Sequence, residues 1–488
     1  METLRWRIVE LLEAIYIFSS RFNGTLIKVT LYGGTLNEVH GGGVAFAVRF
    51  RRPPERHRRG ADSQMKTYSG DRLAELAHRH GLPDDYLRDL RVVSSVLPFR
   101  VNDYVAEELI DWAAAPDDPM FRLTFPHRDM LPPELFASIA ELHDAGSSRD
   151  ALSKVAAEAR GRLNPHPGGQ IDANIPRLDG QPVLGLQHKY RETVLVFPSQ
   201  GQTCHAYCGY CFRWAQFVGS ETRQALSAPA TMVAYLQRHP EVTDVLFTGG
   251  DPMIMKTAVL RRWVDPLLAP NQERIRTLRF GTKALSYWPA RFTAGTDADD
   301  LLRLFERCVA VGRHVAVMAH FSHARELQTT TVQRAIARVR ATGAVIRAQA
   351  PLIAHVNDEA EVWADMWQRL VEFGVVPYYM FVERDTGARS YFEVPLTKGL
   401  DIYSEAMRRV SGLARTARGP VMSTRIGKVL IDGAPIIMGR KVLALRMLQA
   451  RDPDHVGQQF FAGYDPTAHW LDDLEPVLGS VIPGVFAR

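Results

Sequence analysis

The sequence predicts an α/β protein: a partial (β/α)6 barrel with a helical N-terminal domain and a C-terminal extension. The expected strands are six short runs rich in β-branched residues, at 194–198, 242–248, 277–281, 315–320, 345–352 and 376–382. Amphipathic stretches of helical period separate them, near 228–238, 256–268, 299–312, 331–342 and 359–373. Strands that alternate with helices are joined by crossovers, which indicates a parallel sheet. Polar, Gly-containing and aromatic residues follow nearly every strand, which favours a curved barrel over a flat doubly wound sheet.

The chain divides into five expected segments. Residues 1–64 include an arginine-rich run and a Gly-Gly-Gly string, which predict a flexible extension or an artefact of the translation start. Helical spacing of apolar residues predicts a helical domain over 65–160. A Pro- and Gly-rich linker is expected over 161–187, followed by the barrel over 188–400. The segment 401–488 is expected to close the barrel mouth.

Composition excludes several classes of protein. The chain has 488 residues, of which 46% are apolar and 23% are charged. This composition excludes collagen-like, disordered and disulfide-scaffold proteins. The formal charge of +5 is spread along the chain, so no nucleic-acid partner is expected. Glu10 and Glu13 interrupt the N-terminal apolar stretch, and neither a signal peptide nor a membrane span is expected. Clustering of the few cysteines predicts a metal site in a reducing, cytoplasmic setting.

Three of the four cysteines, Cys204, Cys208 and Cys211, lie in the loop after the first expected strand. Thiolates at this spacing can hold three irons of a 4Fe-4S cluster and leave the fourth iron open to a chelating small molecule. The alternative is a structural zinc site completed by His205 or Cys308. His205 adjoins Cys204, which makes joint tetrahedral ligation awkward. Cys308 lies among apolar residues of an expected helix and is predicted to be buried.

The second expected strand ends in Thr248-Gly249-Gly250-Asp251-Pro252. Together with the cysteine loop and the aromatic Tyr210 before its last cysteine, this segment resembles the radical S-adenosylmethionine (SAM) superfamily. The resemblance implies that Gly249, Gly250 and Asp251 hold the methionine amino group of SAM. Glycines allow close approach of backbone carbonyls, and a carboxylate can pair with an ammonium. Tyr210 is expected beside the adenine.

Further strings resemble lysine 2,3-aminomutase over roughly residues 185–400. They are His188-Lys189-Tyr190, Arg279-Phe280-Gly281-Thr282, His320-Phe321-Ser322-His323, Val356-Asn357-Asp358 and Pro377-Tyr378-Tyr379. This resemblance implies an isomerase in which a 5′-deoxyadenosyl radical takes a hydrogen atom from the β-carbon of an amino acid, whose amine then migrates. It further implies a small-molecule substrate, a flavodoxin- or ferredoxin-type reductant and a homo-oligomer. Arg279 is expected to contact the SAM carboxylate or the substrate.

Amine migration in that family uses pyridoxal 5′-phosphate (PLP), anchored on a lysine in a glycine-rich string. A gap-free match from Ser411-Gly412 places Lys428 on the anchor, although the multi-glycine run is missing here. Matching Pro420-Val421-Met422 places Arg418 there instead, and an always-charged arginine cannot serve. Lys428 as an ordinary turn residue before a strand stays open.

Two departures from the family pattern concern the substrate. The arginine run after the third cysteine is reduced to Arg213, which is the expected remnant of a carboxylate clamp. Where lysine-specific members carry an acidic residue after the Tyr-Tyr strand, the register places Arg384, between Glu383 and Asp385. A cation there would repel a lysine side chain and favour an acidic or neutral polar substrate. A shift of one residue would bring Glu383 or Asp385 there instead.

Three hypotheses of function follow. The first is a 1,2-amino shift on a small polar amino acid other than lysine, with PLP on Lys428. The second is a PLP-independent radical SAM dehydrogenase, epimerase or rearrangement enzyme acting on a polar metabolite. The third is a non-catalytic iron–sulfur or zinc protein that senses redox state.

Overall fold

The computed structural model describes residues 65–164, 173–218, 223–477 and 479, which belong to one compact unit. The expectations for residues 1–64 fall outside the described residues. No helix in these ranges is both long and apolar enough to span a bilayer.

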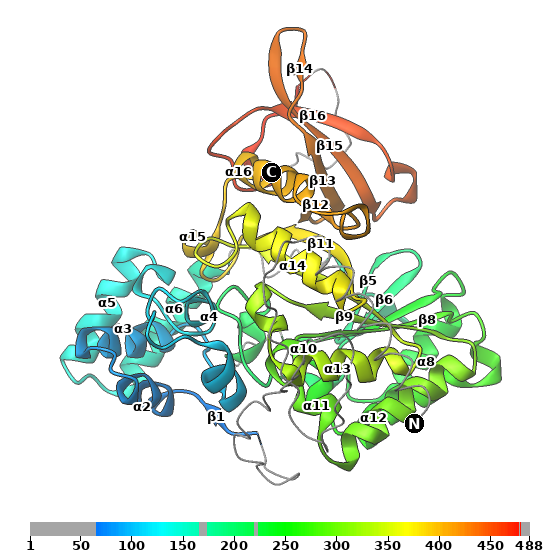
Figure 1. Cartoon of the computed structure of the whole chain (residues 1–488), viewed down its shortest axis with the longest axis horizontal. Helices are drawn as coiled ribbons and strands as arrows, with labels where there is room; N and C mark the ends of the chain where they lie inside the picture. Colours follow the sequence, from blue (N-terminus) through cyan, green and yellow to red (C-terminus); the bar gives the residue numbers. More distant parts are fainter. Residues whose placement is uncertain (1–64, 165–172, 219–222, 478, 480–488) are drawn as a thin grey trace, which may run out of the picture. The chain divides into compact units, whose positions relative to one another are not determined.

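The central sheet contains the six expected parallel strands. They are β6 (Thr193–Val196), β7 (Asp244–Phe247), β8 (Thr277–Thr282), β9 (His314–His320), β10 (Val345–Leu352) and β11 (Val376–Val382). Each pairs in parallel with the next along the chain. The crossovers contain α8 (Pro229–Arg238), α9 (Thr257–Val264), α12 (Gly295–Ala310), α13 (Thr330–Ala341) and α14 (Ala360–Glu372). The predicted order of strands and helices is therefore confirmed (Figure 1).

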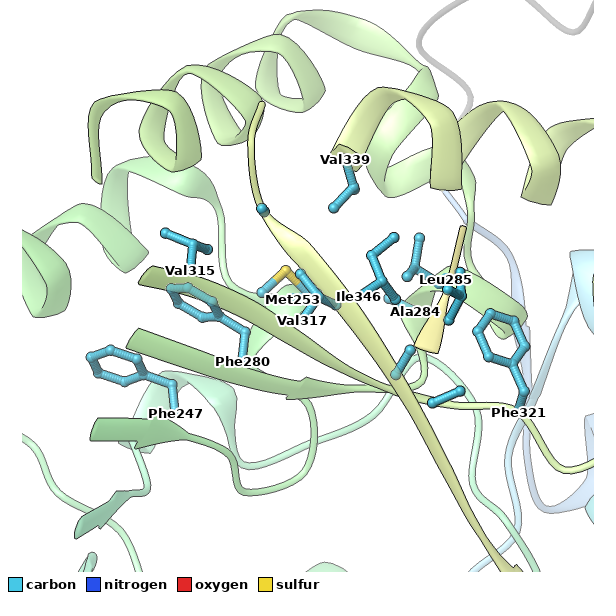
Figure 2. Close-up of a cluster of buried hydrophobic side chains, with 14 of the residues drawn as sticks. Phe247, Met253, Phe280, Ala284, Leu285, Val315, Val317, Phe321, Val339 and Ile346 are labelled. Atoms are coloured by element: carbon cyan, nitrogen blue, oxygen red, sulfur yellow. The ribbon is translucent and has the colours of Figure 1, made fainter. Parts of the chain in front are cut away.

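Side chains alternate between two unlike faces of this sheet. Phe247, Phe280 and Val315 come from three adjacent strands and point to the same side, and Val339 from α13 lies on that side too (Figure 2). These side chains are fully buried in one apolar core. Parallel sheets usually bury both faces. Here the other face carries polar residues such as Arg279, because it borders a cavity.

The N-terminal region is helical, as expected, but it has no core of its own. Its helices are α2 (Asp71–Arg79), α3 (Asp84–Ser94), α4 (Pro119–Thr124), α5 (Pro133–Asp144) and α6 (Arg149–Leu163). A two-stranded sheet, β1 (Thr67–Tyr68) with β2 (Val101–Asn102), accompanies them. Their apolar faces share one buried cluster with Tyr210, Trp214 and Phe392 of the barrel loops. The region therefore packs on the cysteine loop instead of forming an independent domain.

The C-terminal segment extends the sheet. After α16 (Leu396–Arg408), β12 (Arg418–Ser423) pairs in parallel with β11. The antiparallel strands β13 (Gly427–Gly433), β15 (Arg440–Ala450) and β16 (Gln459–Gly463) continue it, with the short β14 (Ile436–Ile437) on β15. At the opposite edge, β5 (Leu186–Tyr190) pairs with β6.

The edge strand β5 and the segment before it approach the C-terminal strands. Lys189 of β5 donates a hydrogen bond to the carbonyl of Thr424, directly after β12. Arg451, directly after β15, donates to the carbonyl of Ala173 and to Oδ1 of Asn174, both at 2.6 Å. The strands of this segment prolong the sheet along the open side of the partial barrel. Residues of the segment, among them Lys428 and Trp470, line the cavity, and closure of the barrel mouth stays a prediction.

Phe280 tests the apolar layer between strands and helices. The Phe280→Ala variant is expected to lose about 3–5 kcal/mol of unfolding free energy, because the aromatic side chain is fully buried and leaves a cavity. Leu413, which is 76% exposed, is the control, and Leu413→Ala should change stability by less than about 0.5 kcal/mol. Chemical denaturation followed by circular dichroism measures both. Equal losses in the two variants would contradict this assignment of the core.

Candidate active site

A cavity of about 800 Å³ is lined by all the residues first assigned to a cofactor or substrate, though not by the alternatives Arg418 and Glu383. The assigned residues are Cys204, Cys208, Tyr210, Cys211, Arg213, Gly249, Gly250, Asp251, Arg279, Arg384 and Lys428. They come from the loops after β6, β7 and β11 and from strands β8 and β13. The fold thus gathers residues separated by more than two hundred positions at one site.

The spacing of the three thiols argues against zinc. Within the described ranges, three ligand atoms from His, Cys, Asp or Glu lie mutually within 4.8 Å only at His188, His239 and Glu241. The sulfurs of the cysteine loop are therefore not all within that distance. Thiolates on one zinc ion, at about 2.3 Å from the metal, would stand only about 3.8 Å apart. A 4Fe-4S cluster places each thiolate on a different iron and fits a wider spacing.

Neither proposed fourth zinc ligand is placed to complete such a site. The Nε2 atom of His205 lies 3.1 Å from Oδ2 of Asp251, and no group of three close ligand atoms in the described ranges joins His205 to the cysteines. Cys308 is fully buried in the apolar core under α12 and does not line the cavity, as its helical position predicted.

The carboxylate of Asp251 joins three segments of the site. Besides His205 from the cysteine loop, it accepts hydrogen bonds from the backbone N–H of Met253 and of Lys283, both at 2.9 Å. The hydroxyl of Thr282, at the end of β8, donates to it at 2.7 Å. Burial raises the pKa of Asp251, but its hydrogen bonds, that from His205 first, outweigh burial and hold the pKa below its usual value.

These contacts give Asp251 a structural role, and its contact with SAM stays a prediction. The sequence suggested that its carboxylate pairs with the ammonium of SAM. In the structure both carboxylate oxygens already accept protein hydrogen bonds. Asp251 therefore organises the loops around the cavity.

Close packing against the cysteine loop requires glycine at positions 249 and 250. A Cβ atom on Gly249 would lie 2.2 Å from Nε2 of Gln202, and one on Gly250 would lie 2.4 Å from the carbonyl oxygen of Thr203. Only glycine allows the segment to approach the start of the cysteine loop this closely. The backbone N–H of Asp251 donates to the carbonyl of Thr203 at 2.9 Å and fixes that approach.

The N-terminal region holds the cysteine loop from the other side. Arg100 donates to Oγ1 of Thr203 at 2.9 Å and to the carbonyl of Cys204 at 3.1 Å. Its guanidinium lies 4.9 Å from the ring centre of Tyr207. Tyr210 is buried, and its hydroxyl lies 3.3 Å from Oγ of Ser322. Contacts from both sides therefore fix the loop before any cofactor binds.

Arg279 lines the cavity but has a partner within the protein. Its Nε lies 2.8 Å from Oδ1 of Asp244, and its Nη2 lies 2.5 Å from Oδ2. The hydroxyl of Thr193 donates to the same carboxylate at 3.1 Å. The expected contact of Arg279 with a ligand carboxylate thus competes with a two-point ion pair, which the sequence did not reveal.

Lys428 extends from β13 into the cavity. Its ammonium donates to Oε1 of Gln449 and lies 4.7 Å from the ring centre of Tyr190. Burial, with the nearby charges of Arg279 and Arg418, lowers its pKa to about 7. Arg418, the alternative anchor position, instead packs 4.4 Å from the ring centre of Tyr379 and does not line the cavity. Of the two positions, the structure places the lysine at the cavity.

Three cavity residues carried no assigned role in the sequence analysis. Lys189 lies 5.4 Å from the ring centre of Tyr190, and burial, Arg384 and Lys428 lower its pKa to about 6. Lys283 pairs with the buried Glu326 at 2.6 Å. Burial lowers the pKa of His320 to about 4, so its imidazole is neutral. Lys189 and His320 stood in the resemblance strings, whereas nothing in the sequence linked Lys283 to Glu326.

The cysteine loop after the first barrel strand and the Gly-Gly-Asp-Pro segment after the second define a radical SAM enzyme. A protein of Aquifex aeolicus named putative L-lysine 2,3-aminomutase is 30% identical over 402 residues, which cover 82% of this chain and 94% of that protein. The chain belongs to the lysine 2,3-aminomutase family.

Other relatives match over shorter stretches. L-lysine 2,3-aminomutase of Escherichia coli is 30% identical over 47% of this chain, and the match covers 63% of that protein. The Bacillus subtilis protein of that name is 28% identical over 58% of this chain and 55% of its own length. No family model matches the chain. A radical SAM methyltransferase from Sphaerobacter thermophilus aligns over 59% of this chain and 93% of its own, with a TM-score of 0.35 and 15% identity.

Gly250 provides a test of the loop geometry. The Gly250→Ala variant is expected to displace the cysteine loop, because the added Cβ would collide with the backbone of Thr203. Iron and sulfide content after anaerobic reconstitution should fall by at least about half. Gly433→Ala is the control, since nothing lies within 4 Å of its added Cβ. Full iron content in Gly250→Ala would show that this close approach is not needed.

Proposed function

We propose that this chain catalyses a radical SAM reaction that removes a hydrogen atom from a small polar amino acid and leads to a 1,2-amino shift. One observation carries the proposal: the three thiols and the buried amine of Lys428 line the same cavity. Iron–sulfur and amine-anchored cofactors could therefore act on one substrate.

Cys204, Cys208 and Cys211 would hold a 4Fe-4S cluster that has one iron without a protein ligand. When bound there and reduced by one electron from a flavodoxin- or ferredoxin-type protein, SAM supplies a 5′-deoxyadenosyl radical able to take a hydrogen atom from carbon. Gly249 and Gly250 keep the adjoining backbone close to the cysteine loop. Tyr210, buried and held near Ser322, forms part of the wall beside the cluster.

The residues around Lys428 fit PLP. An amine with a pKa near 7 can bond covalently to a carbonyl at neutral pH, whereas an ordinary lysine is protonated. Tyr190 and Tyr379 present rings to its amine, and Lys189, beside the same Tyr190 ring, has a nitrogen that can donate a hydrogen bond to a phosphate. When bound, PLP supplies a π-bond to nitrogen that lets an amino group move between neighbouring carbons. Lys428 would anchor it.

Formation of 5′-deoxyadenosine tests the radical reaction. Reconstituted, reduced protein is expected to release it from SAM. Cys204→Ala, Cys208→Ala and Cys211→Ala should each lower the rate at least about 100-fold, because each removes a ligand of the cluster. Cys308→Ala is the matched control, since Cys308 lies in the apolar core. Chromatography with mass detection measures the product. No product from the unmodified protein, in the presence of candidate substrates, would refute the radical SAM mechanism.

Covalent trapping tests the PLP site. Protein incubated with PLP and reduced with cyanoborohydride should carry the label on Lys428, located by peptide mass spectrometry. Labelling should rise between about pH 6 and pH 8 and then level off, because the neutral amine reacts and its pKa is about 7. Lys428→Met should abolish the label, and Lys441→Met, which removes an exposed lysine of β15, should retain it. A label on another lysine would refute the anchor, and the absence of any label would favour PLP-independent chemistry.

A further inference from the structure

Tyr287 is a buried tyrosine close to the cysteine loop. It is the last residue of α10 (Ala284–Tyr287), the short helix that follows β8 and Lys283. Ala284 and Leu285 of this helix lie in the apolar core between strands and helices (Figure 2). Tyr287 belongs instead to the buried cluster of the N-terminal region, against which Cys208 packs. The helix therefore carries its aromatic side chain toward the cysteines.

Contacts from three segments fix the position of Tyr287. The side-chain amide of Asn102, in β2, donates to its carbonyl at 2.8 Å. The ammonium of Lys283 lies 4.3 Å from its ring centre, and the ring centre of His205, in the cysteine loop, lies 6.3 Å away. Because the side chain is fully buried among these groups, its hydroxyl has little freedom to move elsewhere.

The hydroxyl of Tyr287 is a donor that lacks an acceptor. It is buried, and within the residues that the structure describes it forms no complete hydrogen bond. Burial, and then the negative charge of Cys208, raise the pKa of Tyr287 well above its usual value, so the phenol keeps its proton. Buried donors without a partner are costly and rare, and such a group indicates an acceptor that arrives with a ligand.

The sulfur of Cys208 is the acceptor within reach of this hydroxyl. Burial raises the pKa of the Cys208 thiol, whereas the charge of Lys283 and the hydroxyls of Tyr210 and Tyr287 lower it. A neutral thiol is only a weak acceptor, which is why no complete bond forms. A thiolate is an anion, and hydrogen bonds to anions are shorter and stronger. The Tyr287 hydroxyl therefore gains its acceptor when Cys208 is deprotonated as a ligand of iron.

A second phenol, that of Tyr210, is oriented toward the same sulfur by its neighbours. The ammonium of Lys283 donates to Oγ of Ser322 at 3.3 Å, and this oxygen lies 3.3 Å from the hydroxyl of Tyr210. Because Ser322 accepts from Lys283, its own hydroxyl proton can be donated to Tyr210. The proton of Tyr210 is then available to Cys208, whose pKa it lowers. Two phenols thus favour the anionic form of one cysteine.

We propose that Tyr287 raises the reduction potential of the iron–sulfur cluster by donating a hydrogen bond to the sulfur of Cys208. Hydrogen bonds to the sulfurs are among the factors that set the potential of such clusters. Reduction adds one electron and increases the negative charge, so a donor stabilises the reduced form more than the oxidised form. Tyr287 acts through Cys208 and is a positioning residue. This inference rests on the proposed function, because it requires the cluster.

A redox titration of Tyr287→Phe tests the proposal, because the variant keeps the ring and removes only the hydroxyl. Reconstituted protein without SAM is titrated with dithionite and mediators, and the reduced cluster is followed by electron paramagnetic resonance. At a fixed potential the ratio of reduced to oxidised cluster is expected to fall about three- to tenfold. This corresponds to a midpoint lower by about 30–60 mV, at 59 mV per tenfold change. Incomplete iron loading lowers the signal without moving the midpoint.

Tyr391→Phe is the matched control. Tyr391 also carries a buried hydroxyl that forms no complete hydrogen bond within the described ranges. The charges that act on it are those of Arg122, Asp129 and Asp117, not that of a cysteine. Its midpoint should equal that of the unmodified protein. Pulsed resonance of reduced protein reconstituted in deuterated water should also show weaker coupling to exchangeable deuterium in Tyr287→Phe than in Tyr391→Phe.

Failure of this inference can be distinguished from failure of the proposed function. A midpoint in Tyr287→Phe equal to or above that of the unmodified protein would overturn the role of Tyr287 and leave the radical mechanism intact. An equal fall in Tyr391→Phe would do the same. A Tyr287→Phe variant that takes up no iron would show a role in assembly and would also overturn it. No 4Fe-4S signal from the unmodified protein would remove the proposed function, and this inference with it.

Discussion

The site depends on one buried carboxylate. Asp251 binds the imidazole of His205, the hydroxyl of Thr282 and the backbone N–H of Lys283, and so joins the cysteine loop to the ends of β7 and β8. A buried carboxylate without partners would be costly, and these donors exist only when the three segments are in place. The hydrogen bonds that stabilise the carboxylate of Asp251 therefore also hold the cysteine loop in position beside the cavity.

The fold was largely predictable because its strands have one apolar face. Residues such as Phe247 and Phe280 must be buried under helices, and this requirement produces the alternation of short strands and amphipathic helices visible in the sequence. The alternate positions, such as Arg279, face the cavity, so the pattern that indicates the strands also indicates which residues reach the site. The motifs after β6 and β7 indicated where the site lies, because the carboxyl ends of the strands in a parallel barrel lie on one side.

Contacts between distant segments were not predictable in the same way. Nothing near Asp244 in the sequence indicates that it pairs with Arg279, because the pairing follows from the register of adjacent strands. The closure of the barrel side by the C-terminal strands likewise depends on where Lys189 meets Thr424. Gly249 and Gly250 line the cavity, but their close neighbours are protein atoms, which a motif alone does not reveal.

Charge compensation links the fold to the chemistry of the site. A cation that the protein neutralises itself, as Asp244 does Arg279, contributes to the structure whether or not a ligand is present. Lys428 instead donates to the amide oxygen of Gln449, and burial with the nearby charges of Arg279 and Arg418 lowers its pKa to about 7. Because β13 prolongs the sheet, the amine of Lys428 reaches the cavity and lies 4.7 Å from the ring centre of Tyr190 on the edge strand β5. The strands that complete the barrel therefore also supply the amine that we propose as the cofactor anchor.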